Sequence, residues 1–383
     1  MARQSAYILA LSVVFLAVLG IVMLSSTGAY APELPADDPY FAVRRQLCWL
    51  GVGFAACLIG ALVDYGFWGR HWLLWYSIAC ILLGLCFIDG IGIHKNGASR
   101  WIGMGGFQFQ PSEIARLAII VSLAAWFARY RDEVQSWGRG FLYPLLLLGL
   151  PLGLITAEVD LGCATLVGCT TLLVMFVAGT RISGLVTIAV AGAAGLWALI
   201  QIVPDRMNRV LAFMNLDDPI IQLADGYQQW RGLLAFGSGG WAGLGLGASR
   251  QKMQFLPFAH TDFIMPIIGE ELGLRVSLLV VVAFVVLIVC GLLIASQAPD
   301  SFGRLLGLGV VSLIGLQAAI NLGVTTALLP NKGIPLPFIS YGGSNLVCCL
   351  AGIGILFNIY RQGIATPGPT AATIARAKTT RRL

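Results

Sequence analysis

The hydrophobic pattern of this chain consists of long apolar runs separated by short polar segments. A bilayer core about 30 Å thick is crossed by about 20 apolar residues in a helix. Ten runs approach or reach that length, so we expect ten membrane-spanning helices. The expected spans are residues 6–24, 46–63, 72–88, 117–128, 141–157, 161–178, 182–203, 272–294, 305–329 and 346–360. The fourth and tenth runs are short, and each is expected to borrow neighbouring residues or to lie tilted.

The composition of the 383-residue chain agrees with this pattern. Apolar residues make up 58% of the chain and charged residues 11%, whereas a soluble domain has about 45–50% and about 25%. These values exclude a soluble globular enzyme, and the apolar content excludes intrinsic disorder. The expected fold is an all-α polytopic membrane protein of ten transmembrane helices, in which residues 1–362 form the membrane domain. A large extracytoplasmic loop, residues 204–262, is expected between the seventh and eighth helices.

The net charge of +6 indicates membrane topology and not nucleic-acid binding, so no nucleic-acid partner is expected. Ten spans place both termini on one side of the membrane. Short cytoplasmic loops are rich in basic residues, and two short loops here contain Arg129, Arg131, Arg139 and Arg181. Both termini are therefore expected in the cytoplasm, with residues 363–383 forming a disordered basic tail.

Several kinds of site are excluded by what the sequence lacks. The nine cysteines are odd in number, have no CxxC spacing and lie in or beside apolar runs, so they are expected to be packing residues. Only three histidines are present, which argues against a multi-histidine metal site. The chain has no Walker A loop, no nucleotide-binding GxGxxG after a strand and no GxSxG. Transport driven by ATP bound to this chain alone is therefore not expected.

Charged residues near membrane depth are costly, and they indicate function by default. In this chain they gather on the expected outer side, in four places. The first contains Arg100 and a helix start at Pro111 and Ser112, which places Glu113 in the first turn. Arg116 is three residues further and shares the face of Glu113. The two residues form either an ion pair that seals a helix end or part of a functional site.

The second place contains two carboxylates, Glu158 and Asp160, between two apolar spans. Asp160 either caps the N-terminus of the following helix, or both residues face a substrate or a metal ion.

The third place is the segment 204–262, the longest polar stretch in the chain. Long loops of this kind are usually functional, and the glycines near its end fit a turn or a close backbone approach. The segment ends at His260 and Asp262, and Glu270 and Glu271 follow before the next span. Three carboxylates and a histidine at a membrane boundary form an acid–base group, with a helix cap as the alternative.

The fourth place is residues 329–344, where three prolines and three glycines prevent a continuous helix. Such backbone is tolerated at membrane depth only where it is buried in protein or lines a cavity. Lys332 is the one charge in this segment, and a lone cation there suits an anion such as a phosphate. These residues fit an enzyme that acts on a lipid-borne substrate, and they fit a transporter equally well.

The same segments resemble the SEDS family (shape, elongation, division, sporulation). The matching strings are NGASRWI at 96–102, QPSE at 110–113, DLG at 160–162, AFGSGG at 235–240, the stretch 260–273, and PFISYGGS at 337–344. They occur in family order over nearly the whole chain. Residues 245–247, 251–252, 256–257 and 269–271 are most similar to the cell-division branch, FtsW, and the elongation branch, RodA, is the alternative.

The resemblance implies the ten-span SEDS fold in the bacterial cytoplasmic (inner) membrane, at the division septum. It implies a peptidoglycan glycosyltransferase that polymerises lipid II into β-1,4-linked glycan strands with inversion at the anomeric carbon. Its partners would be a class B penicillin-binding protein and other divisome proteins. A lipid II flippase and a non-catalytic scaffold for a penicillin-binding protein are the alternatives of another class.

The resemblance also implies roles for individual residues. Asp262 stands at the family's essential aspartate and is the expected base, assisted by Glu113 and Arg116. The one cofactor that is expected is a divalent cation, Mg or Mn, and no residues of the sequence are identified as its ligands. The expected substrate-binding residues are Arg100, His260, Lys252, Lys332, Asp160, Ser340, Tyr341 and Glu271.

Two departures from the family pattern concern these residues. Arg116 stands where the family usually has lysine, which keeps the charge and changes its reach. Glu158-Val159-Asp160 replaces a string with a central proline.

Overall fold

The computed structural model describes residues 2–32, 35, 38–95, 98–104, 107–202 and 204–365, and within these ranges it is mostly helical. Nine helical segments are long and apolar enough to cross a membrane, and α4 is a shorter apolar helix of 14 residues. The ten expected spans therefore correspond to nine long helices and one short one. The helices are α1 (Ala2–Thr27), α2 (Phe41–Leu62), α3 (Tyr65–Arg70), α4 (Trp72–Leu85), α5 (Pro111–Arg129), α6 (Tyr143–Ala157), α7 (Leu161–Ala178), α8 (Ile182–Ile202), α9 (Pro204–Met214), α10 (Pro219–Gln222), α11 (Tyr227–Gly239), α12 (Ile264–Ser296), α13 (Ser301–Thr325) and α14 (Gly343–Ala365).

Six helices (α1, α2, α5, α12, α13 and α14) begin earlier than the hydrophobic runs that predicted them, and in three of them the added residues are mostly buried. Helix α5 begins at Pro111 and not at 117, α12 begins at Ile264 and not at 272, and α14 begins at Gly343 and not at 346. The added turns contain polar residues that are buried against protein, and hydropathy, which measures transfer into lipid, does not register them. The expected helix start at Pro111, with Glu113 in the first turn, is confirmed.

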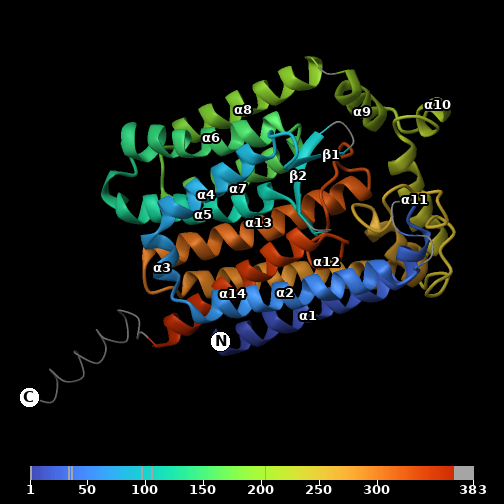
Figure 1. Ribbon diagram of the computed structural model, residues 1–383, viewed down its shortest axis with the longest axis horizontal. Coiled ribbons are helices and arrows are strands. Elements are labelled where there is room, and N and C mark those ends of the chain that lie inside the picture. Colours follow the sequence, from blue (N-terminus) through green and yellow to red (C-terminus); the bar gives the residue numbers. More distant parts are fainter. Residues whose placement is uncertain are drawn as a thin grey trace, which may run out of the picture.

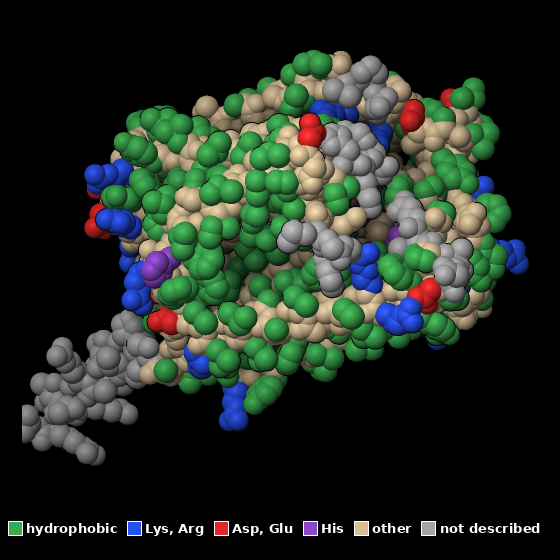
Figure 2. All heavy atoms as spheres, in the orientation of Figure 1, with side chains coloured by type: hydrophobic (Ala, Val, Ile, Leu, Met, Phe, Trp, Pro, Cys, Tyr) green, Lys and Arg blue, Asp and Glu red, His purple; other side chains and the backbone are tan. Residues whose placement is uncertain are grey.

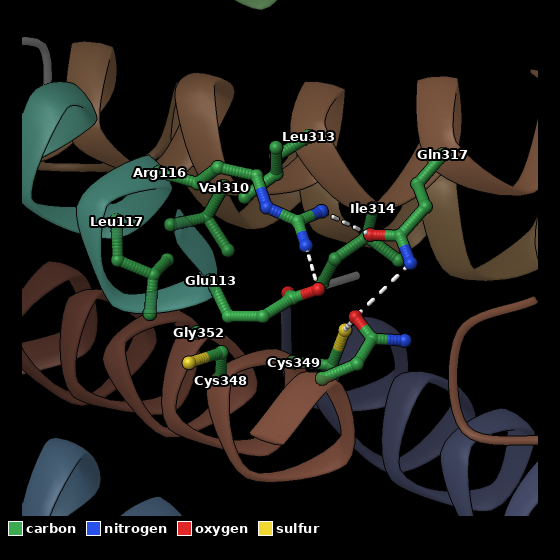
Figure 3. A pocket seen from close by; sticks show the side chains of 11 residues that line it. Glu113, Arg116, Leu117, Val310, Leu313, Ile314, Gln317, Cys348, Cys349 and Gly352 are labelled. Carbon is green, nitrogen blue, oxygen red and sulfur yellow. Dashed lines mark hydrogen bonds and ion pairs between the residues drawn. The ribbon is translucent and has the colours of Figure 1, made fainter. Parts of the chain in front are cut away.

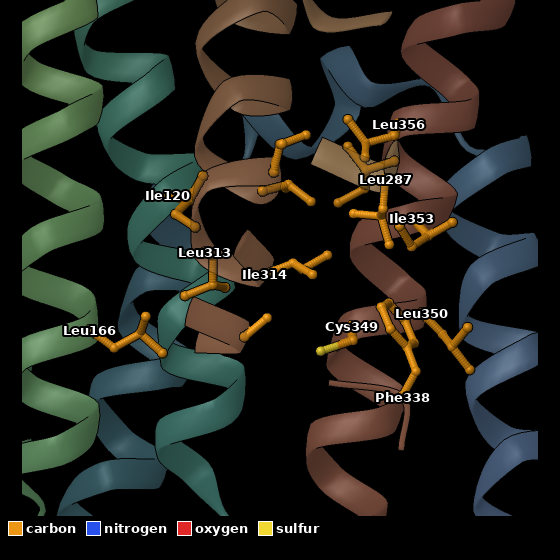
Figure 4. Close-up of a cluster of buried hydrophobic side chains, with 14 of the residues drawn as sticks. Ile120, Leu166, Leu287, Leu313, Ile314, Phe338, Cys349, Leu350, Ile353 and Leu356 are labelled. Carbon is orange, nitrogen blue, oxygen red and sulfur yellow. The ribbon is translucent and has the colours of Figure 1, made fainter. Parts of the chain in front are cut away.

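Helix α13 lies at the centre of the bundle and contacts α5, α7, α12 and α14. Around it α2 packs on α14, and α1 packs on α12. Figure 4 shows the apolar side chains that fill the centre, and those labelled from α5, α7, α13 and α14 include Ile120, Leu166, Leu313, Ile314 and Ile353. Helix α8 is more apolar than α5, yet only 6% of its window is buried against 78% for α5. Helix α8 therefore turns almost all of its apolar surface outward, toward lipid, whereas α5 is buried within the protein.

A small antiparallel sheet, which the hydrophobic pattern did not predict, lies between α4 and α5. Its strands are β1 (Gly92–Lys95), β2 (Ala98–Met104) and β3 (Phe107–Phe109), in the order β1-β2-β3. Ile102 in the central strand pairs with Gly92 on one side and with Phe109 on the other.

The two ends of the bundle differ (Figure 1). One end, here called the loop end, carries the sheet and α9–α11, and the start of α1 and the end of α14 lie toward the opposite end, the termini end. In Figure 2 apolar side chains cover the middle of the visible face, and charged side chains gather toward both ends. This distribution is the one that a membrane-spanning bundle requires. The segment 204–262, expected as a loop, contains three helices of its own.

Two expectations for the C-terminal tail meet different outcomes. Helix α14 continues to Ala365, so the membrane domain extends beyond the expected boundary at residue 362. Most of the expected disordered tail, from residue 366 on, lies outside the described residues.

Candidate active site

Glu113 and Arg116 form a buried ion pair within α5, at the loop end of the bundle. Both side chains are about 95% buried. The Arg116 Nη1 atom also donates a hydrogen bond to Oε1 of Gln317 on α13, at 3.0 Å, as Figure 3 shows. The pair lines a small pocket with Gln317 and Asn345. The expected shared face of Glu113 and Arg116 is therefore confirmed, and the pair links α5 to the central helix.

Asp160 performs the capping role that its position predicts. Its Oδ1 accepts a hydrogen bond from the backbone N–H of Cys163 at 3.0 Å, which caps α7. Its Oδ2 accepts from Nε2 of Gln110 at 3.0 Å, so the cap also joins the start of α5. Asp160 lines a second small pocket together with Gln110, Glu113, Arg116, Cys163, Leu166, Gly333, Ile334 and Pro335. The Asp160 carboxylate thus caps α7 and also lines the pocket.

Arg100, on the central strand β2, reaches across to the turn between α6 and α7. Its Nη2 donates to the carbonyl oxygen of Val159 at 2.8 Å, and its Nε donates to that of Glu158 at 3.3 Å. Val159 adopts a left-handed conformation, with φ of 65°. The small sheet therefore holds a guanidinium beside Asp160.

Lys332, in the loop between α13 and α14, belongs to a group of cations. Burial lowers its pKa most, and the neighbouring Arg206 and Arg209 of α9 lower it further. Asp160 opposes this shift, and Arg100 adds to it. We call Arg100, Arg206, Arg209 and Lys332 the cationic cluster. The charges that act on Lys332 are these three arginines and one carboxylate, Asp160, so the cluster has a surplus of positive charge that suits an anion.

Asp262 lies at the edge of the second pocket, in the loop that precedes α12. Its backbone carbonyl accepts a hydrogen bond from Nδ2 of Asn321 on α13, at 2.8 Å. Its Oδ2 lies 2.8 Å from the position that a Cβ atom on Gly333 would occupy, so the carboxylate packs directly on that glycine. Because Gly333 also lines the pocket of Glu113 and Asp160, the structure brings these three acidic residues to one region.

His260, Ser340 and Tyr341 hold two loops together beside Asp262. Ser340 Oγ donates to the carbonyl of Thr261 at 2.6 Å, and the backbone N–H of Tyr341 donates to the carbonyl of His260 at 3.0 Å. The rings of His260 and Tyr341 have centroids 5.8 Å apart. Burial lowers the pKa of His260 to about 4, so this imidazole is neutral at neutral pH. In this geometry Ser340 and Tyr341 shape the loop that carries Asp262.

Lys252 and Glu271 lie elsewhere, in an enclosed group that we call the glutamate cradle: Glu270, Glu271, Lys252 and the loop 244–251. Lys252 Nζ and Glu271 Oε1 are 2.8 Å apart, and their side chains are 2% and 0% exposed. Lys252 Nζ also donates to Ser26 Oγ of α1 at 2.7 Å. The expectation that Lys252 and Glu271 bind substrate has no support in this geometry, because the protein itself surrounds both charges.

Backbone N–H groups of the same loop complete the cradle. Glu271 accepts from the N–H of Gly247 at 2.9 Å and from that of Ser249 at 3.3 Å. Glu270 accepts from the N–H of Arg250 at 3.1 Å and from that of Gln251 at 3.2 Å. Hydrogen bonds to ionised carboxylates are strong, so the loop is folded around these two side chains.

A break in α12 allows the loop to approach. Gly273 has φ of 78° and ψ of 177°, a conformation that favours glycine, and this interrupts the helix. The N–H groups of Leu244 and Gly245 donate to the carbonyls of Glu270 and Glu271, both at 2.9 Å. The expected close backbone approach near the glycine run is thus confirmed.

The carboxylates of the site already have protein partners. Glu113 is paired with Arg116, and both oxygens of Asp160 accept hydrogen bonds. Within the described residues, no group of three or more His, Cys, Asp or Glu side chains could hold a metal ion. This donor set does not fit a resident divalent cation.

Sequence reasoning missed the amides of α13. Gln317 and Asn321 are one helical turn apart, and both are about 99% buried. Gln317 Nε2 donates to the carbonyl of Pro335 at 2.8 Å and to Oδ1 of Asn345 at 3.0 Å. A polar residue at every fourth position of an otherwise apolar span, continued by Thr325, is the signal that could have identified them.

Comparisons with known proteins agree with this architecture. Residues 7–364 match the model of the family FTSW_RODA_SPOVE, described as cell cycle protein. A protein of Geobacter metallireducens named "Probable peptidoglycan glycosyltransferase FtsW" is 39% identical over 94% of this chain and 96% of its own length. Stage V sporulation protein E of Bacillus subtilis is 38% identical over 92% of this chain and 96% of its own.

A solved chain is similar in fold. It comes from a structure described as "Structural coordination of polymerization and crosslinking by a peptidoglycan synthase complex". The TM-score is 0.75 at 26% identity, over 94% of this chain and 98% of that chain.

Proposed function

This chain belongs to the FtsW, RodA and SpoVE family of cell cycle proteins, and from that premise we propose that it is a membrane-bound peptidoglycan glycosyltransferase of the FtsW type. Its substrate is lipid II, a disaccharide-pentapeptide on undecaprenyl pyrophosphate, which it polymerises into β-1,4-linked strands. The observation that carries the proposal is the cationic cluster beside Asp160 and Asp262 at the loop end. Transfer of a sugar from a pyrophosphate donor needs a carboxylate base for the acceptor hydroxyl and cations for the leaving pyrophosphate in one site.

The bond changes follow those of an inverting glycosyl transfer. Asp262 accepts the proton of the acceptor sugar's 4-hydroxyl while the oxygen of that hydroxyl bonds to the anomeric carbon of the donor. The bond between that carbon and the pyrophosphate oxygen breaks on the opposite face, and the pyrophosphate leaves with the electron pair. Glu113 and Arg116 hold the pocket wall behind this reaction.

The leaving pyrophosphate carries the negative charge that the cationic cluster is suited to receive. Lys332 and Arg100 flank Asp160, and Arg206 and Arg209 extend the positive charge onto α9. Fixed cations in a site poor in water stabilise a developing anion strongly. The expected Mg or Mn stays a prediction without an assigned ligand.

The topology and partners complete the proposal. With Arg129, Arg131, Arg139 and Arg181 at the termini end, the loop end faces outward from the bacterial inner membrane, and both termini are cytoplasmic. The partner is a class B penicillin-binding protein within the divisome, at the septum. The relative named FtsW, 39% identical, supports the FtsW-type role, and a RodA-type elongation role is the second assignment.

Glycan synthesis by purified protein tests the function. Full-length protein with a class B penicillin-binding protein and fluorescent lipid II is expected to give glycan ladders on a gel. Asp262→Asn is expected to fold normally and to lose about 10²–10⁴-fold in rate, the usual contribution of a general base. Asp217→Asn, an exposed carboxylate between α9 and α10, is the matched control and should keep full activity.

The outcomes separate the alternatives. A fully active Asp262→Asn enzyme would refute the base assignment. If neither wild type nor variant polymerises lipid II with a competent partner, the flippase and scaffold functions gain support. Lipid II translocation into the outer leaflet of vesicles then distinguishes those two.

A further inference from the structure

We propose that Asn321 is a positioning residue for the glycosyl transfer, because its single amide group holds both the Asp262 backbone and the Lys332 loop in place. This inference rests on the proposed function, and it assigns a role to a residue on α13 that touches neither the base carboxylate nor the cations directly. The amide acts through the two loops that carry them.

The two hydrogen bonds come from one nitrogen atom. Asn321 Nδ2 donates to the carbonyl of Asp262 at 2.8 Å and to the carbonyl of Ile334 at 2.7 Å. An amide nitrogen has two hydrogens, so both are used. The acceptors come from segments about 70 positions apart in sequence, and this amide joins them in addition to the bonds that Ser340 and Tyr341 make to Thr261 and His260. Asn321 thus fixes Ile334, next to Gly333, relative to Asp262, while the other two bonds join the loops further along.

The support for this amide is rigid. Asn321 is 1% exposed, and α13 is the central helix of the bundle, in contact with α5, α7, α12 and α14. One turn earlier, Gln317 holds the Pro335 carbonyl of the same loop and accepts from Arg116. The loop between α13 and α14 is therefore fastened at two adjacent carbonyls to a helix that has little freedom to move.

The spacing matters because Asp262 packs on the same loop. Its Oδ2 lies 2.8 Å from where a Cβ on Gly333 would be, so there is no room for a side chain between the base and the loop. Gly333 stands between Lys332 and Ile334, the residue whose carbonyl Asn321 holds. A shift of either loop would change the distance between the carboxylate and the cationic cluster. Misplacement of reacting groups by about 1 Å can cost about 10²-fold in rate.

The test compares Asn321→Leu, which keeps the size and removes both donors, with Thr325→Val on the same face of α13. Thr325 is buried and bonds only within its own helix, so Thr325→Val is the matched control for a lost buried polar group. With purified full-length protein, its penicillin-binding partner and fluorescent lipid II, Asn321→Leu is expected to lower kcat about 10–10²-fold. The KM for lipid II should change less than about twofold, because the cationic cluster itself is intact. Thr325→Val should keep both constants.

A second variant covers the case in which Asn321→Leu folds poorly. Gly333→Ala leaves Asn321 in place and puts a methyl group where the Asp262 carboxylate now packs, so the carboxylate must move. It is expected to show the same fall in kcat with a normal KM and a normal unfolding temperature in detergent.

The inference is overturned if folded Asn321→Leu has the kcat of wild type, or if Gly333→Ala does. It is also overturned if both variants change KM and not kcat, since that pattern means a binding role. Absence of glycan from wild type is a different result, because it contradicts the proposed function and is read before any variant is compared.

Discussion

The glutamate cradle and the cationic cluster both lie at the loop end, and both are built from charged residues of the sequence motifs. In the cradle, Lys252 is neutralised by Glu271, and the two glutamates accept N–H and hydroxyl hydrogens from the protein. In the cluster, Asp160 is the one carboxylate among the charges that act on Lys332, and it is already used as a helix cap. The charges of the cradle are paired within the protein, whereas the cluster has a surplus of positive charge.

The difference separates two roles that charged residues of a motif can have in a membrane enzyme, a structural role and a ligand-binding role. Burying a charge is costly unless it is paired and hydrogen-bonded. A charge that has its partners within the protein stabilises the fold, and a surplus of one sign indicates what the ligand must bring. Sequence alone gives the charges but not their partners, so it assigned Lys252 and Glu271 of the cradle to the substrate together with Arg100 and Lys332 of the cluster.

The largest effect expected outside the base itself is on the cradle. Lys252→Met leaves Glu271 buried without its cation, and removing one partner of a buried ion pair costs about 3–5 kcal/mol. We expect the free energy of unfolding in detergent to fall by about that amount. Protein that remains folded should keep the glycosyltransferase activity of wild type per molecule.

The control for Lys252→Met is Arg139→Met, which breaks the exposed Arg139–Glu133 pair at the termini end. Exposed pairs contribute about 0–1 kcal/mol, so this change should be nearly silent. If Lys252→Met were as stable as Arg139→Met and yet inactive, Lys252 would belong with the substrate after all, and the contrast between the two regions would fail.

The next effect is on the cluster. Lys332→Gln removes one cation that has no ion-pair partner among the described residues, so the fold should keep its unfolding temperature. The loss of one charged donor to a developing anion is expected to lower kcat/KM about 10²-fold. Steady-state glycan synthesis over a range of lipid II concentrations measures it.

Arg250→Gln is the matched control for the cluster, since Arg250 is exposed and contributes to the cradle only through its backbone N–H, which the substitution keeps. Equal activity of the two variants would remove Lys332 from the site. A large drop in unfolding temperature for Lys332→Gln would instead make Lys332 a structural charge, like Lys252.

The sequence predicted the parts of this fold that depend on local chemistry. It gave the spans, the start of α5 at Pro111, the face shared by Glu113 and Arg116, and the cap by Asp160. Each of these follows from residues a few positions apart. The start of α12, before Leu272, was missed, because its polar residues Glu270 and Glu271 face protein while hydropathy measures transfer into lipid.

Long-range partners could not be predicted. Ser26 bonds Glu271 across 245 positions, and Asn321 bonds Asp262 across 59. No periodicity encodes such pairs, so the sequence placed Lys252 and Glu271 with the substrate and passed over Asn321. The sheet was missed for a different reason, since two of its three strands have only four and three residues and the third has no sustained alternation of apolar and polar positions.

The last effect expected is a pH dependence of stability from Glu158, a buried carboxylate in the turn between α6 and α7. Its side chain is 1% exposed, and no described residue donates a hydrogen bond to either of its carboxyl oxygens within normal geometry. Burial raises its pKa to about 8 from an ordinary 4.5, and the neighbouring titratable groups are Cys86, Asp160 and Arg100.

Because the folded pKa of Glu158 is above the unfolded one, the folded state holds the proton that the unfolded state has released between pH 4.5 and about 8. The free energy of unfolding should therefore fall as the pH rises through this range and level off above it. Glu158→Gln removes the slope, so its stability relative to wild type should increase from pH 5 to pH 8 in detergent unfolding. Glu133→Gln, an exposed glutamate at the termini end, should track wild type across the range. A difference between Glu158→Gln and wild type that is the same at every pH would mean that Glu158 is ionised in the folded protein, and it would then need a cation and belong with the cluster.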